Sequence, residues 1–184
     1  MTLLSLTEAS QLIRKSEVIA TPTEAVYGLS ADPYQLDAVQ KILSLKQRTP
    51  DKGLILIASD VSQLISWVDW PRLTPEQCEV ILARWPGPIT WIVPAKSTVS
   101  PLLRGQFDTI AVRVTAHPVM RALCQNCGHA LVSTSANVSG EPPAKTIEAI
   151  AQQFGPTFPI LEGALGHSAQ PTDIIDAMSG RRVR

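Results

Sequence analysis

The segment 53–58, with the sequence GLILIA, is a continuous apolar run of the kind that forms a strand buried on both faces of a sheet. Before it, Leu36, Val39 and Ile42 recur at helical spacing, so a helix precedes the strand. Helical and strand patterns alternate in this way along the chain. The alternation predicts an α/β fold, in which helices cover a twisted, mixed sheet.

Capping signals and apolar patterns predict the remaining elements. Thr74 can act as an N-cap, with Pro75 at the first helical position and Gln77 as the reciprocal capping residue. Thr7 is expected to cap a first amphipathic helix. A late helix is predicted after Thr146, and another between residues 115 and 130 that ends near Gly128; further strands are predicted at residues 18–20, where Pro22 stops the strand, and at 89–93, 109–115, 130–136 and 173–176.

Length and composition indicate one soluble domain that spans residues 1–184. A chain of 184 residues can bury one full hydrophobic core but is short for two ordinary domains. Hydrophobic residues make up 45% and charged residues 17%, which excludes a disordered chain or a coiled coil. Neither a repeat nor a low-complexity linker interrupts the sequence.

The sequence indicates a cytoplasmic protein with no membrane segment. No stretch approaches the roughly 18 uncharged apolar residues of a membrane span, and residues 1–10 lack the basic flank and apolar run of a secretion signal. The cysteines are expected to be reduced and buried as small hydrophobic residues. Cys124 and Cys127 form a C-x-x-C pair, but only Cys78 remains as a further thiol, so no protein metal site is expected.

Charge and missing motifs narrow the classes of function. Sixteen basic and sixteen acidic residues cancel, so any anion site must be local. The sequence has no G-x-x-x-x-G-K-[ST], G-x-G-x-x-G, G-x-S-x-G or H-E-x-x-H motif. His117, His129 and His167 have no evident nucleophile or ligand partner and are interpreted as surface or loop residues. Nucleophilic catalysis and metal-dependent hydrolysis are therefore poor hypotheses.

Two polar clusters follow predicted elements in the first third of the chain. Residues 21–28, TPTEAVYG, come directly after a strand and are either a functional loop or a proline turn with a capping threonine. Residues 46–52, KQRTPDK, carry three cations. Lys46 and Arg48 can converge on one ligand only if the helix ends there, which Pro50 favours. The alternative is that these cations only complement the dipole of the helix C-terminus.

A third cluster lies in the predicted strand 109–115. Its alternating pattern places Ala111, Arg113 and Thr115 on one face. An arginine in the middle of a strand is costly to bury unless it meets an anion. Either an internal carboxylate or a ligand must satisfy Arg113, and the pattern leaves both possibilities open.

The fourth cluster is at the end of the strand 130–136. Ser133 and Ser135 share one side, and Asn137 follows where the strand gives way to a loop. These groups can bind a phosphate, a carboxylate or a base edge, or they can form a hydrogen-bonded turn. The residues by themselves therefore predict an anion-binding α/β protein.

Five segments together resemble a known family. PTEAVYGL, LKQR followed by Pro50, RWPGPIT, AVRV and STSANVSG occur in the order and spacing of the YrdC/TsaC family, the threonylcarbamoyl-AMP synthases. The resemblance extends from about Thr7 to Arg184 and is to the short bacterial form. It implies a YrdC-like single domain with a large, basic concave cavity that holds ATP and threonine.

The resemblance also implies roles for individual residues. The K-x-R and S-x-N signatures of the family, expected to be catalytic, fall on Lys46, Arg48, Ser135 and Asn137. The residues implied to lie toward ATP are Arg48, Lys52, Thr109, Ser135 and Arg184, and those toward threonine are Thr23, Arg113, Ser133 and Thr172.

The sequence departs from the longer relatives in three places. Lys52 stands where they often have asparagine, and Ile57 stands where they have a histidine that contacts substrate. The chain ends at Arg184 without their second domain, so no lid from such a domain is expected.

The implied reaction suits these side chains. The amine of L-threonine and bicarbonate give an N-carboxylate, which attacks the α-phosphorus of ATP and expels pyrophosphate. Such a transfer needs positioning and charge neutralisation, for which lysine, arginine, hydroxyls and Mg²⁺ bound to ATP suffice. Arg113 can make a two-pronged contact to a carboxylate. The resemblance also implies that the product serves the threonylcarbamoyl modification of adenosine 37 in tRNAs that read codons beginning with adenine.

The main alternative is an RNA-binding or ribosome-assembly protein whose basic cavity holds a nucleic-acid backbone. Aromatic residues make up only 5% of the chain and the net charge is zero, which disfavours base stacking and a nucleic-acid surface as the primary role. Weak tRNA binding is compatible with the enzyme hypothesis. The expected downstream partners are proteins that transfer the threonylcarbamoyl group to tRNA.

Overall fold

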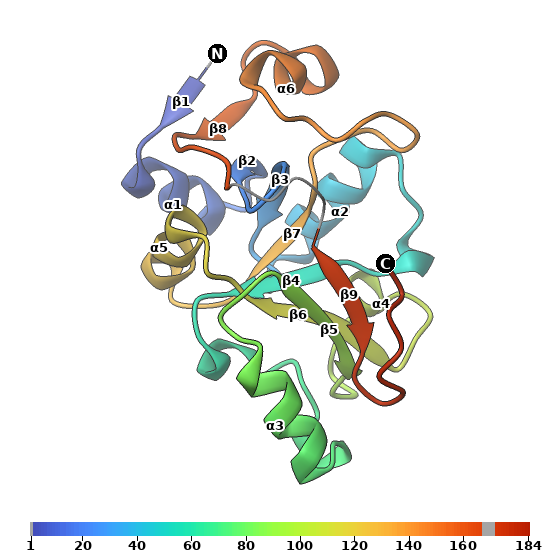
Figure 1. Cartoon of the computed structure of the whole chain (residues 1–184). Coiled ribbons are helices and arrows are strands. Elements are labelled where there is room, and N and C mark those ends of the chain that lie inside the picture. Colours follow the sequence, from blue (N-terminus) through green and yellow to red (C-terminus); the bar gives the residue numbers. More distant parts are fainter. Residues whose placement is uncertain (1, 167–171) are drawn as a thin grey trace.

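The computed structural model describes residues 2–166 and 172–184, which form a single mixed α/β domain (Figure 1). Its helices are α1 (Leu6–Arg14), α2 (Leu36–Lys46), α3 (Pro75–Ala83), α4 (Pro101–Arg104), α5 (Pro118–Cys127) and α6 (Ile147–Phe154), with short 3-10 turns at Pro50–Lys52, Val61–Leu64 and Trp70–Arg72. Its strands are β1 (Thr2–Leu4), β2 (Ile19–Pro22), β3 (Tyr27–Ala31), β4 (Ile55–Ala58), β5 (Ile89–Pro94), β6 (Thr109–Val114), β7 (Leu131–Ser135), β8 (Pro159–Leu161) and β9 (Asp173–Asp176).

The described strands form one mixed sheet in the order β1-β8-β2-β3-β7-β4-β6-β5-β9. Strand β4 pairs with β6 in parallel and with β7 antiparallel, so the predicted GLILIA strand lies inside the sheet. Parallel pairs also join β8 to β1 and β2, and β5 to β9, while β3 runs antiparallel to both β2 and β7. The mixed sheet covered by helices that the sequence predicts is confirmed.

Both faces of the sheet are packed. On one face, Ile19, Ile57 and Leu131 pack in a hydrophobic cluster with residues of α1 and α5, which lie side by side (Figure 1). On the other face, Leu56 and Val132 belong to the larger core, into which α2 also packs. Because successive side chains of a strand point to opposite faces, β4 buries apolar residues on both sides. This explains why the segment 53–58 is apolar without interruption.

Local capping chemistry sets several helix boundaries. Thr74 caps α3 in the predicted reciprocal arrangement with Gln77, and Thr146 caps α6. Helix α5 ends at Gly128, whose φ of 85° suits a residue without a side chain. The predicted cap at Thr7 is wrong, because Ser5 and Glu8 form the capping box two residues earlier and α1 begins at Leu6.

Strand β3 is the largest element that the sequence pattern does not predict. All of Tyr27–Ala31 is buried, and the strand forms a hairpin with β2 and pairs with β7 on its other side. Strand β2 also runs to Pro22, two residues beyond the predicted end at residue 20. The β2–β3 turn therefore places the cluster 21–28 at the edge of the cavity described next.

Candidate active site

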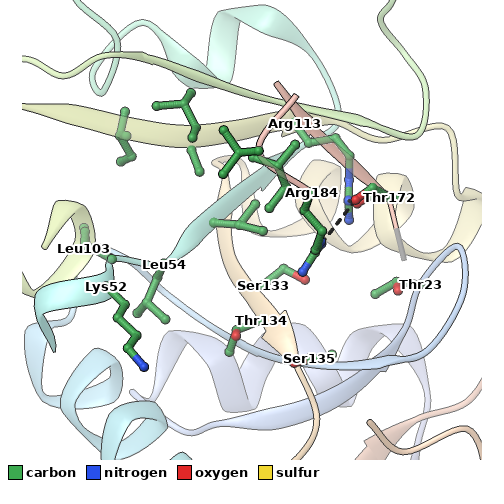
Figure 2. A pocket seen from close by; sticks show the side chains of 18 of the residues that line it. Thr23, Lys52, Leu54, Leu103, Arg113, Ser133, Thr134, Ser135, Thr172 and Arg184 are labelled. Carbon is green, nitrogen blue, oxygen red and sulfur yellow. Dashed lines mark hydrogen bonds between the residues drawn. The ribbon is translucent and has the colours of Figure 1, made fainter. Parts of the chain in front are cut away.

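A cavity of about 480 Å³ lies on the face of the sheet that carries Ile55, Ala111 and Ser133 (Figure 2). These residues line the cavity from three neighbouring strands, β4, β6 and β7, in which they are register partners. Register partners in a sheet project to the same face, which is why three strands can contribute to one wall. The volume is in the range of small-molecule sites.

The cavity lining is strongly cationic. Five basic residues line it, and none of the described lining residues is an aspartate or a glutamate. The basic residues are Arg48, Lys52, Arg104, Arg113 and Arg184. Since cations concentrated in a concave site attract and bind anions, the arrangement suits a ligand with several negative charges.

Part of the wall is apolar. Leu54, Leu103, Phe107, Ile110 and Val183 line the cavity together with these cations. Phe107 and Val183 remain about half exposed, at 48% and 54%. An apolar wall next to a cationic lining fits a ligand that combines a flat, weakly polar group with anionic groups.

Lys46 does not line the cavity. Helix α2 ends at Lys46, as predicted, and Gln47 adopts a left-handed conformation with φ 49°. The Lys46 ammonium, however, is buried and donates hydrogen bonds to the carbonyl oxygens of Ser135 and Asn137 and to Asn137 Oδ1. Burial, with a smaller contribution from Arg48, lowers the pKa of Lys46 to about 8. The predicted convergence of Lys46 and Arg48 on one ligand is therefore not what the structure shows: Lys46 ties α2 to the loop after β7.

Asn137 also lies behind the cavity wall. Its side-chain amide donates to the carbonyl oxygens of Val138 and Glu141, both at 2.9 Å. Its Oδ1 accepts from Lys46 of α2, so both polar atoms of this side chain have partners outside the cavity lining. Lys46 and Asn137 thus fix the end of β7, which places Ser133 and Ser135 in the lining.

Arg48 and Lys52 reach the cavity from the segment after α2. Arg48 Nη2 donates to the carbonyl oxygen of Gly53 at 2.9 Å, and burial lowers the pKa of its guanidinium. Figure 2 shows Lys52 on the opposite side of the cavity from Arg113. The loop therefore supplies cations at one end, and the strand β6 supplies one at the other.

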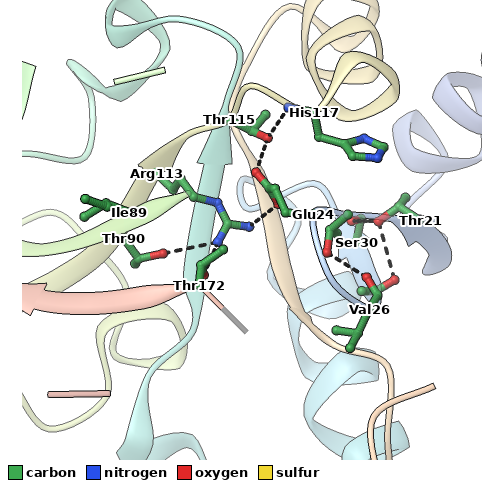
Figure 3. A network of polar contacts seen from close by, with 12 residues as sticks. Thr21, Glu24, Val26, Ser30, Ile89, Thr90, Arg113, Thr115, His117 and Thr172 are labelled. Atoms are coloured by element: carbon green, nitrogen blue, oxygen red, sulfur yellow. Dashed lines mark hydrogen bonds and ion pairs between the residues drawn. The ribbon is translucent and has the colours of Figure 1, made fainter. Parts of the chain in front are cut away.

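Arg113 meets an internal carboxylate and also lines the cavity. Its Nη2 lies 3.2 Å from Glu24 Oε2, and its Nη1 donates to the hydroxyls of Thr172 and Thr90 (Figure 3). Only 5% of Arg113 is exposed, and burial lowers the pKa of its guanidinium. The internal carboxylate is thus confirmed, and contact of Arg113 with a ligand in the cavity stays a prediction.

The remaining predicted site residues, Thr23, Thr109, Thr172 and Arg184, line the same cavity. Thr23 Oγ1 donates to the carbonyl oxygen of Val26 at 2.6 Å, and Arg184 Nη2 donates to that of Thr172 at 3.2 Å. The described structure therefore brings together all the predicted residues except Lys46 and Asn137. Ile57 is fully buried in the cluster with α1 and α5, so it contributes no atom to the lining.

Sequence reasoning missed Glu24, Thr90 and Arg104 as individual site residues. Glu24 was within the cluster 21–28, but only the fold shows that it faces Arg113. Thr90 stands in RWPGPIT, one of the segments that carry the family resemblance, which was a signal for it. Arg104 lies in a four-residue helix that the pattern did not predict.

The described histidines and cysteines do not form a reactive site. His117 lies in the loop before α5, as one of the two predicted alternatives, but it is buried rather than on the surface; His167 lies outside the described residues. Burial raises the pKa of the Cys124 thiol and raises that of Cys127 to about 11, so both thiols are protonated near neutral pH. Within the described ranges, three or more metal-binding side chains do not gather at any point.

No helix in the described part of the chain combines the length and the hydropathy needed to cross a membrane.

Comparison with known proteins identifies the family. A family model for Sua5, YciO and YrdC, described as "Telomere recombination", matches residues 11–184. A threonylcarbamoyl-AMP synthase of Serratia proteamaculans is 46% identical over 172 residues, which cover 94% of this chain and 91% of the relative. A threonylcarbamoyl-AMP synthase of Escherichia coli O1:K1 is 48% identical over 176 residues, which cover 96% and 93%.

Solved structures show the same fold. Sua5 of P. abyssi in complex with L-threonine has a TM-score of 0.86 at 29% identity, over 96% of this chain and 54% of that one. The chain thus spans just over half the length of that protein. YciO of E. coli has a TM-score of 0.79 at 24% identity, over 95% and 88%. The chain belongs to the Sua5/YciO/YrdC family.

Proposed function

We propose that this protein is a nucleotidyltransferase that converts L-threonine, bicarbonate and ATP to threonylcarbamoyl-AMP and pyrophosphate. The observation that carries the proposal is a cavity lined by five cations and, among the described residues, by no carboxylate. The chain is also 46% and 48% identical to relatives named threonylcarbamoyl-AMP synthase, and a structural neighbour binds L-threonine. These relatives favour the enzyme over the RNA-binding alternative.

The two ends of the cavity suit two different anionic groups. Arg113, with the nearby hydroxyls of Thr23, Ser133 and Thr172, is suited to the carboxylate of threonine. Arg48 and Lys52, with Ser135 and Thr109, are suited to the triphosphate and ribose of ATP. Arg184 is also assigned to ATP, and it approaches from the Arg113 side, where it donates to the carbonyl oxygen of Thr172. The apolar wall around Leu103 and Phe107 is suited to the flat purine.

The chemistry then depends on positioning and charge. The threonine nitrogen attacks the carbon of bicarbonate, and loss of water leaves an N-carboxylate. A carboxylate oxygen of this group attacks the α-phosphorus, a new P–O bond forms, and the bond to the β-phosphate breaks with release of pyrophosphate. Arg48 and Lys52 stabilise the negative charge that develops on the phosphoryl oxygens, and no residue forms a covalent bond to substrate.

Magnesium is proposed to enter with ATP as part of the substrate. The described lining offers hydroxyls and cations but no carboxylate, so its donor set does not fit a resident metal ion. The phosphate oxygens of ATP supply the ligands that the protein lacks. When bound in this way, Mg²⁺ neutralises charge on the β- and γ-phosphates.

The product is proposed to serve tRNA modification in the cytoplasm. The mixed anhydride of a carbamic acid and AMP is an activated acyl donor, so a second reaction must transfer the threonylcarbamoyl group to its acceptor. We assign that step to separate proteins that act on adenosine 37 of tRNA.

Isothermal titration with ATP and then with L-threonine tests this proposal. The expected result is saturable binding of both, with no binding of threonine to an Arg113→Met variant and retained binding of ATP by it. Labelled bicarbonate should then enter a product that contains threonine and AMP. Binding of ATP without binding of threonine, by protein that is shown to be folded, would contradict the proposal.

A further inference from the structure

The Glu24 carboxylate contacts Arg113 without lining the cavity. Its neighbours Thr23 and Ala25 are among the lining residues, whereas Glu24 is not among those described there. The side chains of Glu24 and Arg113 are only 10% and 6% exposed, and Oε2 lies 3.2 Å from Nη2. Glu24 therefore acts on the one cation of the lining that comes from the strand β6.

The Arg113 guanidinium is held at its two terminal nitrogens by different elements. Nη2 pairs with Glu24, and Nη1 donates to the hydroxyls of Thr90 on β5 and Thr172 beside β9 (Figure 3). A guanidinium is planar, so contacts at both terminal nitrogens fix the plane of the group as well as its position. Of these contacts, only that with Glu24 is an ion pair, so Glu24 is the one partner that neutralises the charge of the guanidinium.

The backbone of Glu24 is itself fixed. Thr23 N donates to the carbonyl oxygen of Val26 at 3.2 Å and closes the β2–β3 turn, and Gly166 N donates to the carbonyl oxygen of Thr23 at 2.9 Å. A Cβ atom on Gly166 would lie 2.6 Å from the carbonyl oxygen of Glu24. Gly166 thus packs directly on the backbone of Glu24 and leaves it little freedom.

The second carboxylate oxygen is held from another direction. Thr115 Oγ1 donates to Glu24 Oε1 at 2.6 Å, and the same hydroxyl accepts from His117 N at 3.0 Å (Figure 3). The orientation of the Thr115 hydroxyl is set by that backbone group, so its proton points to Glu24. Two hydrogen bonds thus link the start of α5 through Thr115 to Glu24, and the ion pair of Glu24 continues this network to Arg113.

Burying the Glu24–Arg113 ion pair costs free energy, and a gain in stability does not explain why the pair is present. Removing two opposite charges from water offsets most of their attraction, so a buried ion pair adds little net stability. Its benefit is a defined orientation of the guanidinium at the cavity surface. We propose that Glu24 is a positioning residue that orients Arg113 for the carboxylate of the amino-acid substrate, with Thr115 orienting Glu24 in turn. This inference rests on the proposed function, in which Arg113 binds that carboxylate.

The substitution Glu24→Gln tests the proposal, because it keeps the size of the side chain and removes the charge. Glutamine offers one acceptor oxygen where glutamate offers two, so Thr115 and Arg113 cannot both keep an acceptor, and the guanidinium loses its charged partner in either orientation of the amide. Loss of one charge-assisted contact predicts a rise in the threonine KM of roughly 10- to 100-fold, with the ATP KM unchanged. The matched control is Glu17→Gln, at an exposed ion pair with Lys41, which should change neither KM.

The pair Thr115→Val and Thr115→Ser gives a second readout that does not alter either charge. Thr115→Val removes the hydroxyl with little change in shape and should raise the threonine KM in the same direction as Glu24→Gln. Thr115→Ser keeps the hydroxyl and should restore a threonine KM close to that of the wild type. This pair decides the question if Glu24→Gln does not fold.

The outcomes separate the positioning role from the proposed function. If wild-type protein binds no threonine by calorimetry, the proposed function fails and this inference fails with it. If wild-type protein binds threonine but the Glu24→Gln and Thr115→Val variants bind it equally well, with lower thermal stability only, the network is structural and the positioning role is wrong.

Discussion

Glu24 and Arg113 form an ion pair of 3.2 Å in which the two side chains are 10% and 6% exposed. Removal of one partner leaves an uncompensated charge in a nearly dry position. The variant Arg113→Met should therefore lower the free energy of unfolding by about 3–5 kcal/mol, and the double variant Arg113→Met/Glu24→Leu should recover most of that loss. Urea unfolding measures both values.

The double variant should separate the effect on stability from the effect on threonine binding. The double variant should fold but bind no threonine, because the carboxylate-binding cation is absent. If the double variant is no more stable than Arg113→Met, then the unpaired charge of Glu24 is not what destabilises the Arg113→Met variant.

Lys46 is expected to stabilise the loop after β7 rather than to contact phosphate. Its ammonium donates to the carbonyl oxygens of Ser135 and Asn137, and Lys46 is only 2% exposed. Replacement by methionine leaves these carbonyl groups without their donor and should lower the free energy of unfolding by about 1–3 kcal/mol. Activity should fall as well, since Ser135 loses its support. Lys41→Met, at an exposed lysine, is the control; equal thermal stability of Lys46→Met and wild type would contradict the assignment.

The lowered pKa of Lys46 also predicts a pH dependence. Burial lowers this pKa from 10.5 to about 8, so between these values the unfolded chain binds the proton and the folded protein does not. Stability then rises with pH in that window, and it is constant with respect to this group below about pH 8, where both states are charged. The difference in free energy of unfolding between wild type and Lys46→Met should shift in favour of wild type as the pH is raised from 8 to 10.5. A difference that stays flat across the window would show that the Lys46 pKa is close to its ordinary value.

Arg48 is expected to act on ATP. Loss of one charge-assisted contact in the transition state costs about 2–4 kcal/mol, so Arg48→Ala should reduce the turnover rate roughly 30- to 1000-fold. Arg48 also donates to the Gly53 carbonyl oxygen, so thermal stability must be measured with the rate. Arg72→Ala removes an exposed arginine paired with Asp108 and is the control. Turnover by Arg48→Ala at the wild-type rate would contradict the assignment of Arg48 to the phosphates of ATP.

Cys127 should react slowly with alkylating reagents at neutral pH. Burial raises its pKa to about 11, and only the thiolate is an effective nucleophile. The rate of its modification by iodoacetamide, followed by mass spectrometry of peptides, should increase about tenfold per pH unit up to that region. Modification at pH 7 as fast as that of a free thiol would contradict the burial of this group.

Much of the central sheet could be predicted from the sequence because its residues carry their own signal. The run at 53–58 is apolar on both faces. The start of α3 could be predicted for a similar reason, because Thr74 and Gln77 form a local capping box. Strand β3 has no such signal, because YGLSA mixes glycine, serine and tyrosine and becomes a strand only between β2 and β7. The pairing of distant segments, not the local pattern, defines that element.

The site shows the same division. The motifs indicate which residue types gather at the cavity, but they do not show that the side chain of Lys46 points away from it. That direction depends on how the end of α2 packs against the end of β7 and the loop after it. These segments are distant in the sequence, since Lys46 and Ser135 are 89 residues apart. In the same way, no pattern in residues 109–115 could reveal that the carboxylate for Arg113 comes from Glu24 in a turn near the start of the chain.

The most direct test of the central claim is the release of pyrophosphate from ATP by the purified protein with Mg²⁺. The two anion-binding ends of the cavity predict release only when L-threonine and bicarbonate are both present. Omission of either should abolish it, and labelled bicarbonate should appear in a product that contains threonine and AMP. Release that continues in degassed, bicarbonate-free buffer, or without threonine, would contradict the account.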